Sequence, residues 1–302
     1  MLTFESPQFE DRQWVQPLLD AEGSFGCEYN FTNIYLWSRA WPQKIARLGD
    51  RLLVRIQGSL GLSYLYPAGR GPLAPAVDAL AADAAAQDKP LVLVCVTDGQ
   101  KAALEEACPG RFQFEEDRDG FDYLYDIDRL ADLPGKKLHA KRNHIRRFDD
   151  QFPDWLLEDI TPANVPECVE LERQWCAIRQ EEAGEDIDSV SEETVAVIEA
   201  LYHMDKLELE GALIRADGSP IAFSLGGLIT PEVFDVNFEK SFGDIQGAYP
   251  AINRELARLV RTRHPRVKWL NREDDMGLEG LRRAKLSYYP DLLLTKYTAR
   301  ES

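Results

Sequence analysis

The sequence contains few of the features that mark membrane proteins, metal-binding proteins and disulfide-bonded proteins. None of its 302 residues lies in an apolar run approaching the roughly 18 residues of a transmembrane helix, so we expect no integral membrane segment. The five cysteines form no Cys-x-x-Cys pair, and the four histidines lack the spacing of metal ligands. We therefore expect reduced thiols, no metal site and a cytoplasmic location.

Signatures of several enzyme classes are also missing. The chain has no Walker A loop, no dinucleotide-binding glycine fingerprint and no Gly-x-Ser-x-Gly elbow. Basic residues are outnumbered as well, because 35 Lys and Arg against 52 Asp and Glu give a formal net charge of −17. A chain this acidic repels nucleic acid except at local basic surfaces, so we expect no binding of double-stranded DNA.

The main exception to this acidity lies near the middle of the chain. Residues 136–147 contain six Lys and Arg and no acid. If this segment is a helix, Leu138, Ile145 and Phe148 form one apolar stripe, with the cations beside it. The stripe predicts a helix that docks on a core rather than a loose basic tail.

Two interpretations of this basic helix stay open. In one, Lys141, Arg142 and Arg146 bind the phosphates of a ligand, such as a CoA-type carrier or the acceptor end of an aminoacyl-tRNA. In the other, the helix is a linker whose cations pair with the acidic surface of the protein itself.

Hydrophobic periodicity predicts the same order of elements in both halves of the chain. In the first half, two helices precede an antiparallel meander over 44–66, a helix over 73–87 and a strand over 91–96. In the second half, two helices precede a meander over 207–241 and a helix over 248–263. A strand, a short helix and a last strand end each half. This order indicates an α+β protein with mixed sheets.

We expect the boundaries between the parts to follow this repeat. They are an N-terminal domain over 1–132, a basic linker helix over 133–150 and a C-terminal domain over 151–302.

Three segments resemble a bacterial family that is described by its similarity to the C-terminal domain of phosphatidylglycerol lysyltransferase. They are residues 135–148, 247–253 and 271–290, the last reading Asn-Arg-Glu-Asp-Asp-Met-Gly-Leu-Glu-Gly-Leu-Arg-Arg-Ala-Lys-Leu-Ser-Tyr-Tyr-Pro. The resemblance implies two tandem domains of the GCN5-related acyltransferase (GNAT) fold, which Fem-type aminoacyl transferases share. The family has no established substrate, so the resemblance does not supply one.

The turn before the helix over 248–263 is the candidate donor-binding site. In the GNAT fold this helix start receives the pyrophosphate of the acyl donor, and Gly243 and Gly247 permit close approach of a ligand. Tyr249 and Asn253 follow in the first turns of the helix. The acyl-CoA signature, Gln or Arg-x-x-Gly-x-Gly or Ala, is not satisfied at either glycine. This departure favours a donor other than CoA, or an ordinary helix start with turn glycines.

Residues 271–275 follow one predicted strand and precede a helix, which places them at the end of a strand where open sheets form sites. Asp275 is explained as the N-cap of the next helix. Glu273 and Asp274 remain, and one of these two could act as a general base. Glu239, at the end of the strand over 233–241, is the other candidate base. Tyr288 occupies the position from which related acyltransferases protonate a leaving group, although a core tyrosine with a satisfied hydroxyl is an equal explanation.

The sequence therefore favours an acyl- or aminoacyltransferase. An acceptor amine or hydroxyl would attack an acyl group carried by CoA or by aminoacyl-tRNA, forming an amide or an ester. The alternative is a non-catalytic tandem-domain protein that binds an anionic or nucleotide-like ligand. Catalysis is favoured if Lys141, Arg142 and Arg146 share a cleft with Glu273 and Gly247.

Overall fold

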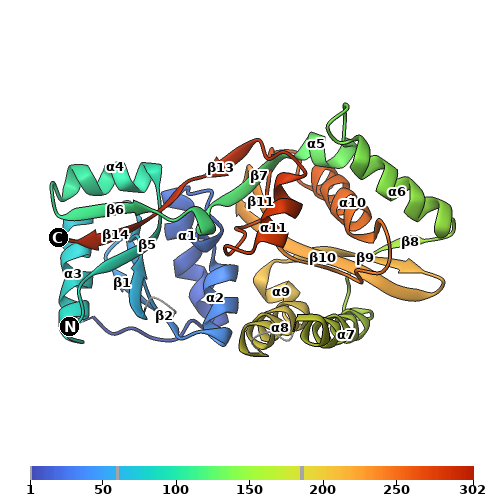
Figure 1. Cartoon of the computed structure of the whole chain (residues 1–302). Coiled ribbons are helices and arrows are strands. Elements are labelled where there is room, and N and C mark those ends of the chain that lie inside the picture. Colours follow the sequence, from blue (N-terminus) through green and yellow to red (C-terminus); the bar gives the residue numbers. More distant parts are fainter. Residues whose placement is uncertain (1, 59–60, 184–186) are drawn as a thin grey trace. The chain divides into compact units, whose positions relative to one another are not determined.

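The computed structural model describes residues 2–58, 61–183 and 187–302 (Figure 1). The chain folds into two compact units that are each assembled from separate segments. Unit 1 comprises Met1–Tyr123, Glu273–Arg283 and Leu293–Ser302, and unit 2 comprises Leu124–Arg272 and Ala284–Leu292.

This division differs from the expected boundaries of 1–132, 133–150 and 151–302. The end of the chain forms strand β14 (Lys296–Glu301), which pairs antiparallel with β5 (Val92–Thr97) and β6 (Phe112–Glu116) and so belongs to the first sheet. The basic helix α6 (His139–Gln151) belongs to unit 2 rather than to a separate linker.

The remaining elements of unit 1 follow the predicted order. They are α1 (Arg12–Glu22), α2 (Phe31–Ala40), β1 (Gln43–Leu48), β2 (Arg51–Gly58), β3 (Gly61–Leu65), β4 (Ala68–Gly69), α3 (Leu73–Ala85) and α4 (Asp98–Ala107), with one-turn 3₁₀ helices at Phe9–Asp11, Cys27–Tyr29 and Arg118–Gly120. The sheet has the order β1-β2-β3-β5-β14-β6, and β4 pairs with β2. The meander and the buried strand β5 confirm the sequence predictions for this half.

The second sheet has the order β13-β7-β12-β11-β10-β9-β8. Its strands are β7 (Asp122–Asp126), β8 (Leu156–Asp159), β9 (Glu210–Ala216), β10 (Ser219–Thr230), β11 (Val233–Ser241), β12 (Trp269–Asn271) and β13 (Leu292–Leu294). Its helices are α5 (Ile127–Asp132), α6, α7 (Val165–Ala183), α8 (Ile187–Tyr202), α9 (Met204–Leu207), α10 (Ala248–Arg263) and α11 (Glu279–Leu286). The segment predicted as one last strand is thus two strands, β13 and β14, in different sheets.

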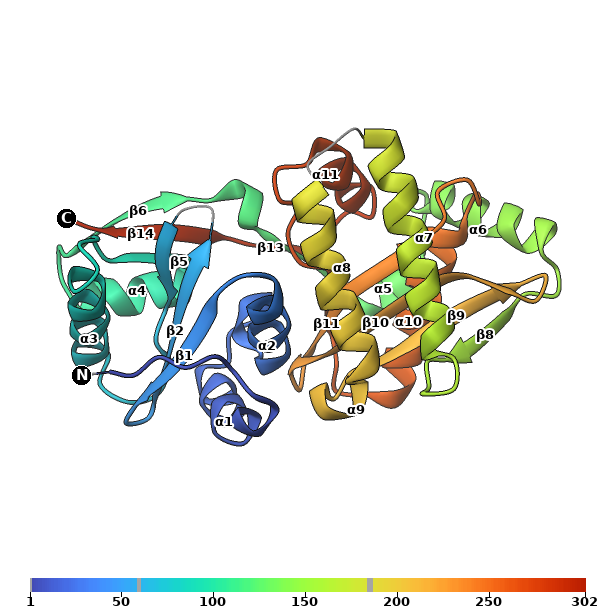
Figure 2. The same ribbon diagram turned by 90° about the horizontal axis from the view of Figure 1, so that it is seen from below.

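Helices cover both faces of the β9–β11 part of this sheet. Figures 1 and 2 show α10 and α6 on one face and α7 and α8 on the other. This arrangement explains why β9 to β11 are buried along most of their length, as a strand covered on both faces must be.

Strands β11 and β12 pair over only part of β11. They run parallel from Val233 opposite Trp269 to Asp235 opposite Asn271, and β12 then ends while β11 continues to Ser241. Beyond this point, the edge of β11 on the β12 side has no paired strand in the part of the chain that the structure describes. Residues placed here from β11, from the end of β12 and from α10 can therefore gather around one site.

Candidate functional site

The basic segment of the sequence forms the linker before α6 and the first part of that helix. Leu138, Ile145 and Phe148 are each at most 2% exposed. Their burial confirms that the helix docks on a core through this stripe.

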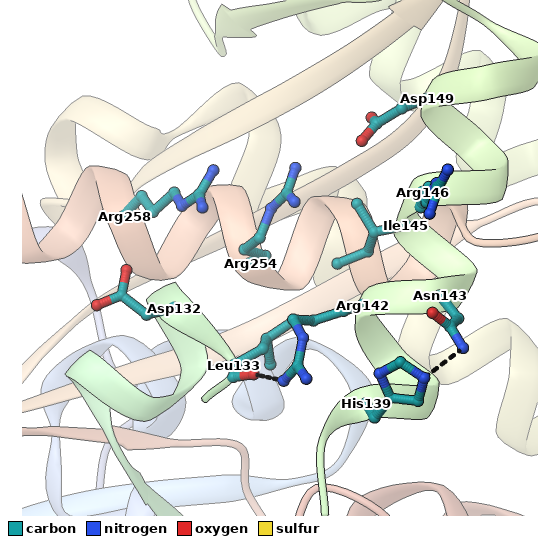
Figure 3. Close-up of a pocket in the computed structure, with 10 residues that line it drawn as sticks. All are labelled: Asp132, Leu133, His139, Arg142, Asn143, Ile145, Arg146, Asp149, Arg254 and Arg258. Carbon is teal, nitrogen blue, oxygen red and sulfur yellow. Dashed lines mark hydrogen bonds between the residues drawn. The ribbon is translucent and has the colours of Figure 1, made fainter. Parts of the chain in front are cut away.

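The three cations of this segment that we predicted to bind phosphates lie in two different places. Lys141 Nζ is 3.9 Å from the centre of the Tyr288 ring. Arg142 donates hydrogen bonds to two backbone carbonyl oxygens that follow α5, and the side chain of Arg146 is 82% exposed. Arg142 and Arg146 line a surface pocket whose lining, in the described part of the chain, does not include Lys141 (Figure 3).

Lys141 and four other side chains of unit 2 form what we name the polar cluster: Lys141, Glu239, Asn253, Arg272 and Tyr288. Arg272 Nη2 donates to Glu239 Oε1 at 2.9 Å, and Asn253 Nδ2 donates to Glu239 Oε2 at 3.0 Å. The guanidinium carbon of Arg272 lies 5.1 Å from the centre of the Tyr288 ring. Arg272 and Lys141 are thus two cations on the same aromatic ring. The cluster thus joins β11, α10, α6 and the residue that follows β12.

The amine of Lys141 is held in an environment that disfavours its charge. Burial, and then the positive charge of Arg272, lower the pKa of Lys141 to about 8, and Glu239 only partly opposes this shift. Burial also raises the pKa of the Tyr288 hydroxyl above its ordinary value. Near pH 8 a substantial fraction of Lys141 is therefore neutral and able to accept a proton.

Two polar atoms of the cluster have unused hydrogen-bonding capacity. Arg272 Nη1 and Asn253 Oδ1 are buried and lack a hydrogen-bond partner among the residues that the structure describes. Buried polar atoms are nearly always satisfied, so an unsatisfied donor and an unsatisfied acceptor in one cluster indicate a place for a ligand.

The pKa of Lys141 predicts a pH dependence of stability that does not depend on any substrate. Between about pH 8 and the ordinary value of 10.5, the unfolded chain binds more protons at this lysine than the folded chain. The free energy of unfolding should therefore rise with pH in this window, relative to that of Lys141→Met. Urea unfolding of both proteins at several pH values checks this, and parallel pH dependences would contradict it.

The turn before α10 is less suited to a pyrophosphate than a typical helix start. Ala248 N already donates to Ile245 O at 3.2 Å, and Pro250 has no N–H to offer. Tyr249 turns its hydroxyl to accept a hydrogen bond from Trp175 Nε1 at 3.0 Å. Two backbone positions at this helix start, Ala248 and Pro250, thus offer no free N–H where the GNAT fold binds the phosphates of CoA.

Gly247 is required by a close contact with α6. Its φ is +90°, and an added Cβ would overlap the carbonyl oxygen of His144 and lie 3.0 Å from Cβ of Phe148. Gly243, by contrast, is exposed and has nothing within 4 Å of an added Cβ. The role of either glycine in phosphate binding stays a prediction.

This difference predicts the effects of two matched substitutions. Gly247→Ala should lower the free energy of unfolding by about 1–3 kcal/mol, from backbone strain and the overlap with α6. Gly243→Ala should change it by less than about 0.5 kcal/mol, as surface substitutions usually do. Guanidinium unfolding of both variants checks this, and equal stabilities would show that α6 does not press on Gly247.

The acids of residues 271–275 lie in unit 1. Glu273, with φ of +53°, receives a hydrogen bond on Oε1 from Asn33 Nδ2 at 3.1 Å. Asp275 does not cap a helix as expected, because α11 begins at Glu279. Instead its buried carboxylate accepts from Tyr123 Oη at 2.5 Å, from the guanidinium of Arg282 and from a backbone N–H.

Unit 1 also contains a buried ionic group that the sequence did not indicate. Cys27, Glu28 and Asp122 bring ligand-type atoms within 4.8 Å of one another. Lys296 Nζ lies among them, 2.6 Å from Glu28 Oε1, 2.6 Å from Asp122 Oδ1 and 3.6 Å from Cys27 Sγ. The ammonium group supplies the positive charge that the carboxylates need, so we interpret this group as an internal salt bridge.

Sequence reasoning missed Arg272 as a member of the polar cluster, although the residue lies within a quoted motif. The signal that could have identified Arg272 is its place directly after β12, at the end of a strand. The acids that follow it have the same signal and were predicted instead. Of the predicted site residues, the structure brings Lys141, Glu239, Asn253 and Tyr288 together, while Glu273 belongs to unit 1.

Solved structures of other proteins share this fold. A conserved protein of unknown function from Bacteroides thetaiotaomicron is 35% identical, with a TM-score of 0.92 over 100% of both chains. L-PGS from Bacillus licheniformis is 14% identical, with a TM-score of 0.68 over 98% of this chain and 93% of that chain. FemX is 10% identical, with a TM-score of 0.58 over 98% and 96%. The predicted α+β fold of two tandem GNAT-like domains is confirmed.

Comparison of sequences extends this likeness. An uncharacterised protein of Mycoplasmoides gallisepticum is 21% identical over 187 aligned residues, and the alignment covers 59% of this chain and 55% of the length of that relative. No helix in the described part of the chain is long and apolar enough to cross a membrane. A sequence model of the family described as phosphatidylglycerol lysyltransferase, C-terminal, matches residues 22–300, and the chain belongs to this family.

Proposed function

We propose that the protein transfers an aminoacyl group from an ester donor to an acceptor hydroxyl or amine, and that the reaction takes place at the polar cluster of unit 2. The observation that carries this proposal is the cluster itself, in which a lysine of lowered pKa lies beside an unsatisfied donor and an unsatisfied acceptor. A site of this kind can bind a polar acyl group and move one proton.

The unsatisfied atoms match the two ends of an α-aminoacyl group. Arg272 Nη1 would donate to the carbonyl oxygen, whose negative charge grows as the acceptor attacks. Asn253 Oδ1 would accept a hydrogen bond from the α-ammonium group. A simple acetyl group offers nothing to the second atom, so the pair favours an aminoacyl donor.

Lys141 would serve as the base. The acceptor oxygen or nitrogen forms a bond to the carbonyl carbon and passes its proton to the neutral Lys141 amine. The ester C–O bond then breaks, and the same proton moves to the departing oxygen. The Tyr288 ring, 3.9 Å from Lys141 Nζ, stabilises the ammonium form of Lys141 between these two steps. The Tyr288 hydroxyl stays a second candidate for the proton donor.

Glu239 would position Arg272 and Asn253 rather than take the proton of the acceptor. Each of its carboxylate oxygens already accepts a hydrogen bond, one from Arg272 and the other from Asn253. These bonds hold both groups so that their remaining atoms face the same ligand. This role differs from that of a general base, which we predicted for Glu239 from its place at the end of the strand.

The donor is best sought among aminoacyl-tRNAs. The acyl-CoA signature is not satisfied at Gly243 or Gly247, and Pro250 removes one N–H from the first turn of α10, which favours a donor other than CoA. The family name points to lysine as the first aminoacyl group to try and to phosphatidylglycerol as the first acceptor.

The experiment that tests the proposal follows a labelled aminoacyl group. The protein is incubated with labelled lysyl-tRNA and phosphatidylglycerol vesicles, with parallel arms that contain other aminoacyl-tRNAs, acetyl-CoA or soluble amines. We expect label to leave an aminoacyl-tRNA and appear in a product only when folded protein is present. Binding of the donor without any product would support the non-catalytic alternative, and transfer from acetyl-CoA alone would contradict the aminoacyl donor.

A further inference from the structure

A pocket separate from the polar cluster lies in unit 2 between α5, α6 and α10. Its volume is about 370 Å³. Four arginines line it, two from α6 and two from α10: Arg142, Arg146, Arg254 and Arg258 (Figure 3). In a chain with a net charge of −17, four guanidinium groups around one pocket are a local concentration of positive charge, of the kind that binds an anion.

The two acids of the pocket lining are already engaged elsewhere. Asp132 accepts hydrogen bonds from Arg261 at 2.9 and 3.2 Å, which lower the pKa of Asp132. Asp149 Oδ1 accepts from Trp155 Nε1 at 2.9 Å. Four arginines against two aspartates also leave the lining with an excess of positive charge.

The arginines keep free donors for a ligand. Arg254 uses Nε to reach Glu255 Oε1 at 2.7 Å, and its two terminal nitrogens make no hydrogen bond to any residue that the structure describes. Arg258 gives Nε to a backbone carbonyl and Nη1 to the same Glu255 oxygen. Figure 3 shows the ends of Arg254 and Arg258 on the side of α10 on which Asp149 lies, and Arg142 on the other side, beside Leu133. The carboxylate of Glu255 thus accepts hydrogen bonds from both Arg254 and Arg258, and each guanidinium group keeps further N–H donors for a ligand.

We propose that this pocket binds the phosphate group of a small soluble phosphate ester, or free phosphate itself. A phosphate oxyanion matches the forked donors of arginine, and several guanidinium groups can share its charge. The proposal does not rest on the proposed transfer activity, because the lining contains neither Lys141 nor another member of the polar cluster among the described residues.

Calorimetric titration with inorganic phosphate, pyrophosphate and ribose 5-phosphate at low salt tests this pocket. The variants are Arg254→Gln, whose hydrogen bond among the described residues goes to its neighbour Glu255, and Arg146→Gln, whose side chain is 82% exposed. Arg266→Gln is the matched control, since this substitution removes the same charge at a residue that is exposed and lies outside the pocket. Thermal unfolding confirms that each variant is folded.

We expect each pocket variant to weaken binding by about 10-fold or more, the loss expected for one charge-assisted hydrogen bond, and the control to bind as the wild type does. Tighter binding of ribose 5-phosphate than of phosphate would identify an ester as the ligand, and the reverse would identify the free anion. Equal affinities in all four proteins, or no binding of any probe to the wild type, would overturn the proposal.

Discussion

Replacing Lys296 with methionine is expected to lower the free energy of unfolding by about 3–5 kcal/mol, the cost of removing one partner from a buried ion pair. The side chain of Lys296 is 1% exposed and that of Asp122 is fully buried. Methionine fills a similar volume, so the loss comes from the two carboxylates, Glu28 and Asp122, that remain without their cation. Guanidinium unfolding at neutral pH measures it.

Two further variants isolate the ionic cause. Lys89→Met removes an exposed lysine of unit 1 and should leave stability within about 0.5 kcal/mol of the wild type. The double variant Lys296→Met with Asp122→Asn removes a charge of each sign and should recover part of the loss. A Lys296→Met protein as stable as the wild type would show that the buried group does not hold unit 1 together.

Replacing Lys141 with methionine is expected to slow aminoacyl transfer by about 10²–10⁴-fold, which is the usual contribution of a positioned general base. The variant should remain folded, because it removes an amine whose charge is disfavoured where it lies. The rate is measured with saturating donor, so that the change reports the reaction rather than binding.

Lys136→Met is the matched control for this variant. Lys136 belongs to the same basic segment, is exposed and is not part of the polar cluster. It should transfer at a rate close to that of the wild type. If Lys136→Met and Lys141→Met slow the reaction equally, the basic segment acts only through its charge, and the base must be sought elsewhere.

Much of the fold could be predicted because local patterns reflect it directly. The alternation of apolar and polar residues in 233–241 predicted β11, and the stripe of Leu138, Ile145 and Phe148 predicted a docked α6. The pairing of β14 with β5 and β6 was not predictable in the same way. Residues 296–301 carry a strand pattern, but nothing local says which sheet a strand joins, since that depends on contacts far apart in sequence.

The same limit shaped the prediction of the site. Glu239, Asn253 and Tyr288 were predicted as site residues from the end of a strand, the first turns of a helix and a position after the last helix, and the structure brings them together. Arg272 and Glu273 are neighbours in sequence, yet Arg272 joins Glu239 in unit 2 while Glu273 joins Asn33 in unit 1. The unit boundary falls between them, and no property of either residue marks it.

The pH dependence of single-turnover transfer, measured for the wild type and for Lys141→Met, shows whether Lys141 is the base. If Lys141 is the base, the wild-type rate rises as its amine loses its proton and levels off above about pH 8, following the lowered pKa of this lysine. The variant should then be slow at every pH, without that rise. A variant that keeps the same rise at the same pH would contradict transfer at the polar cluster through Lys141.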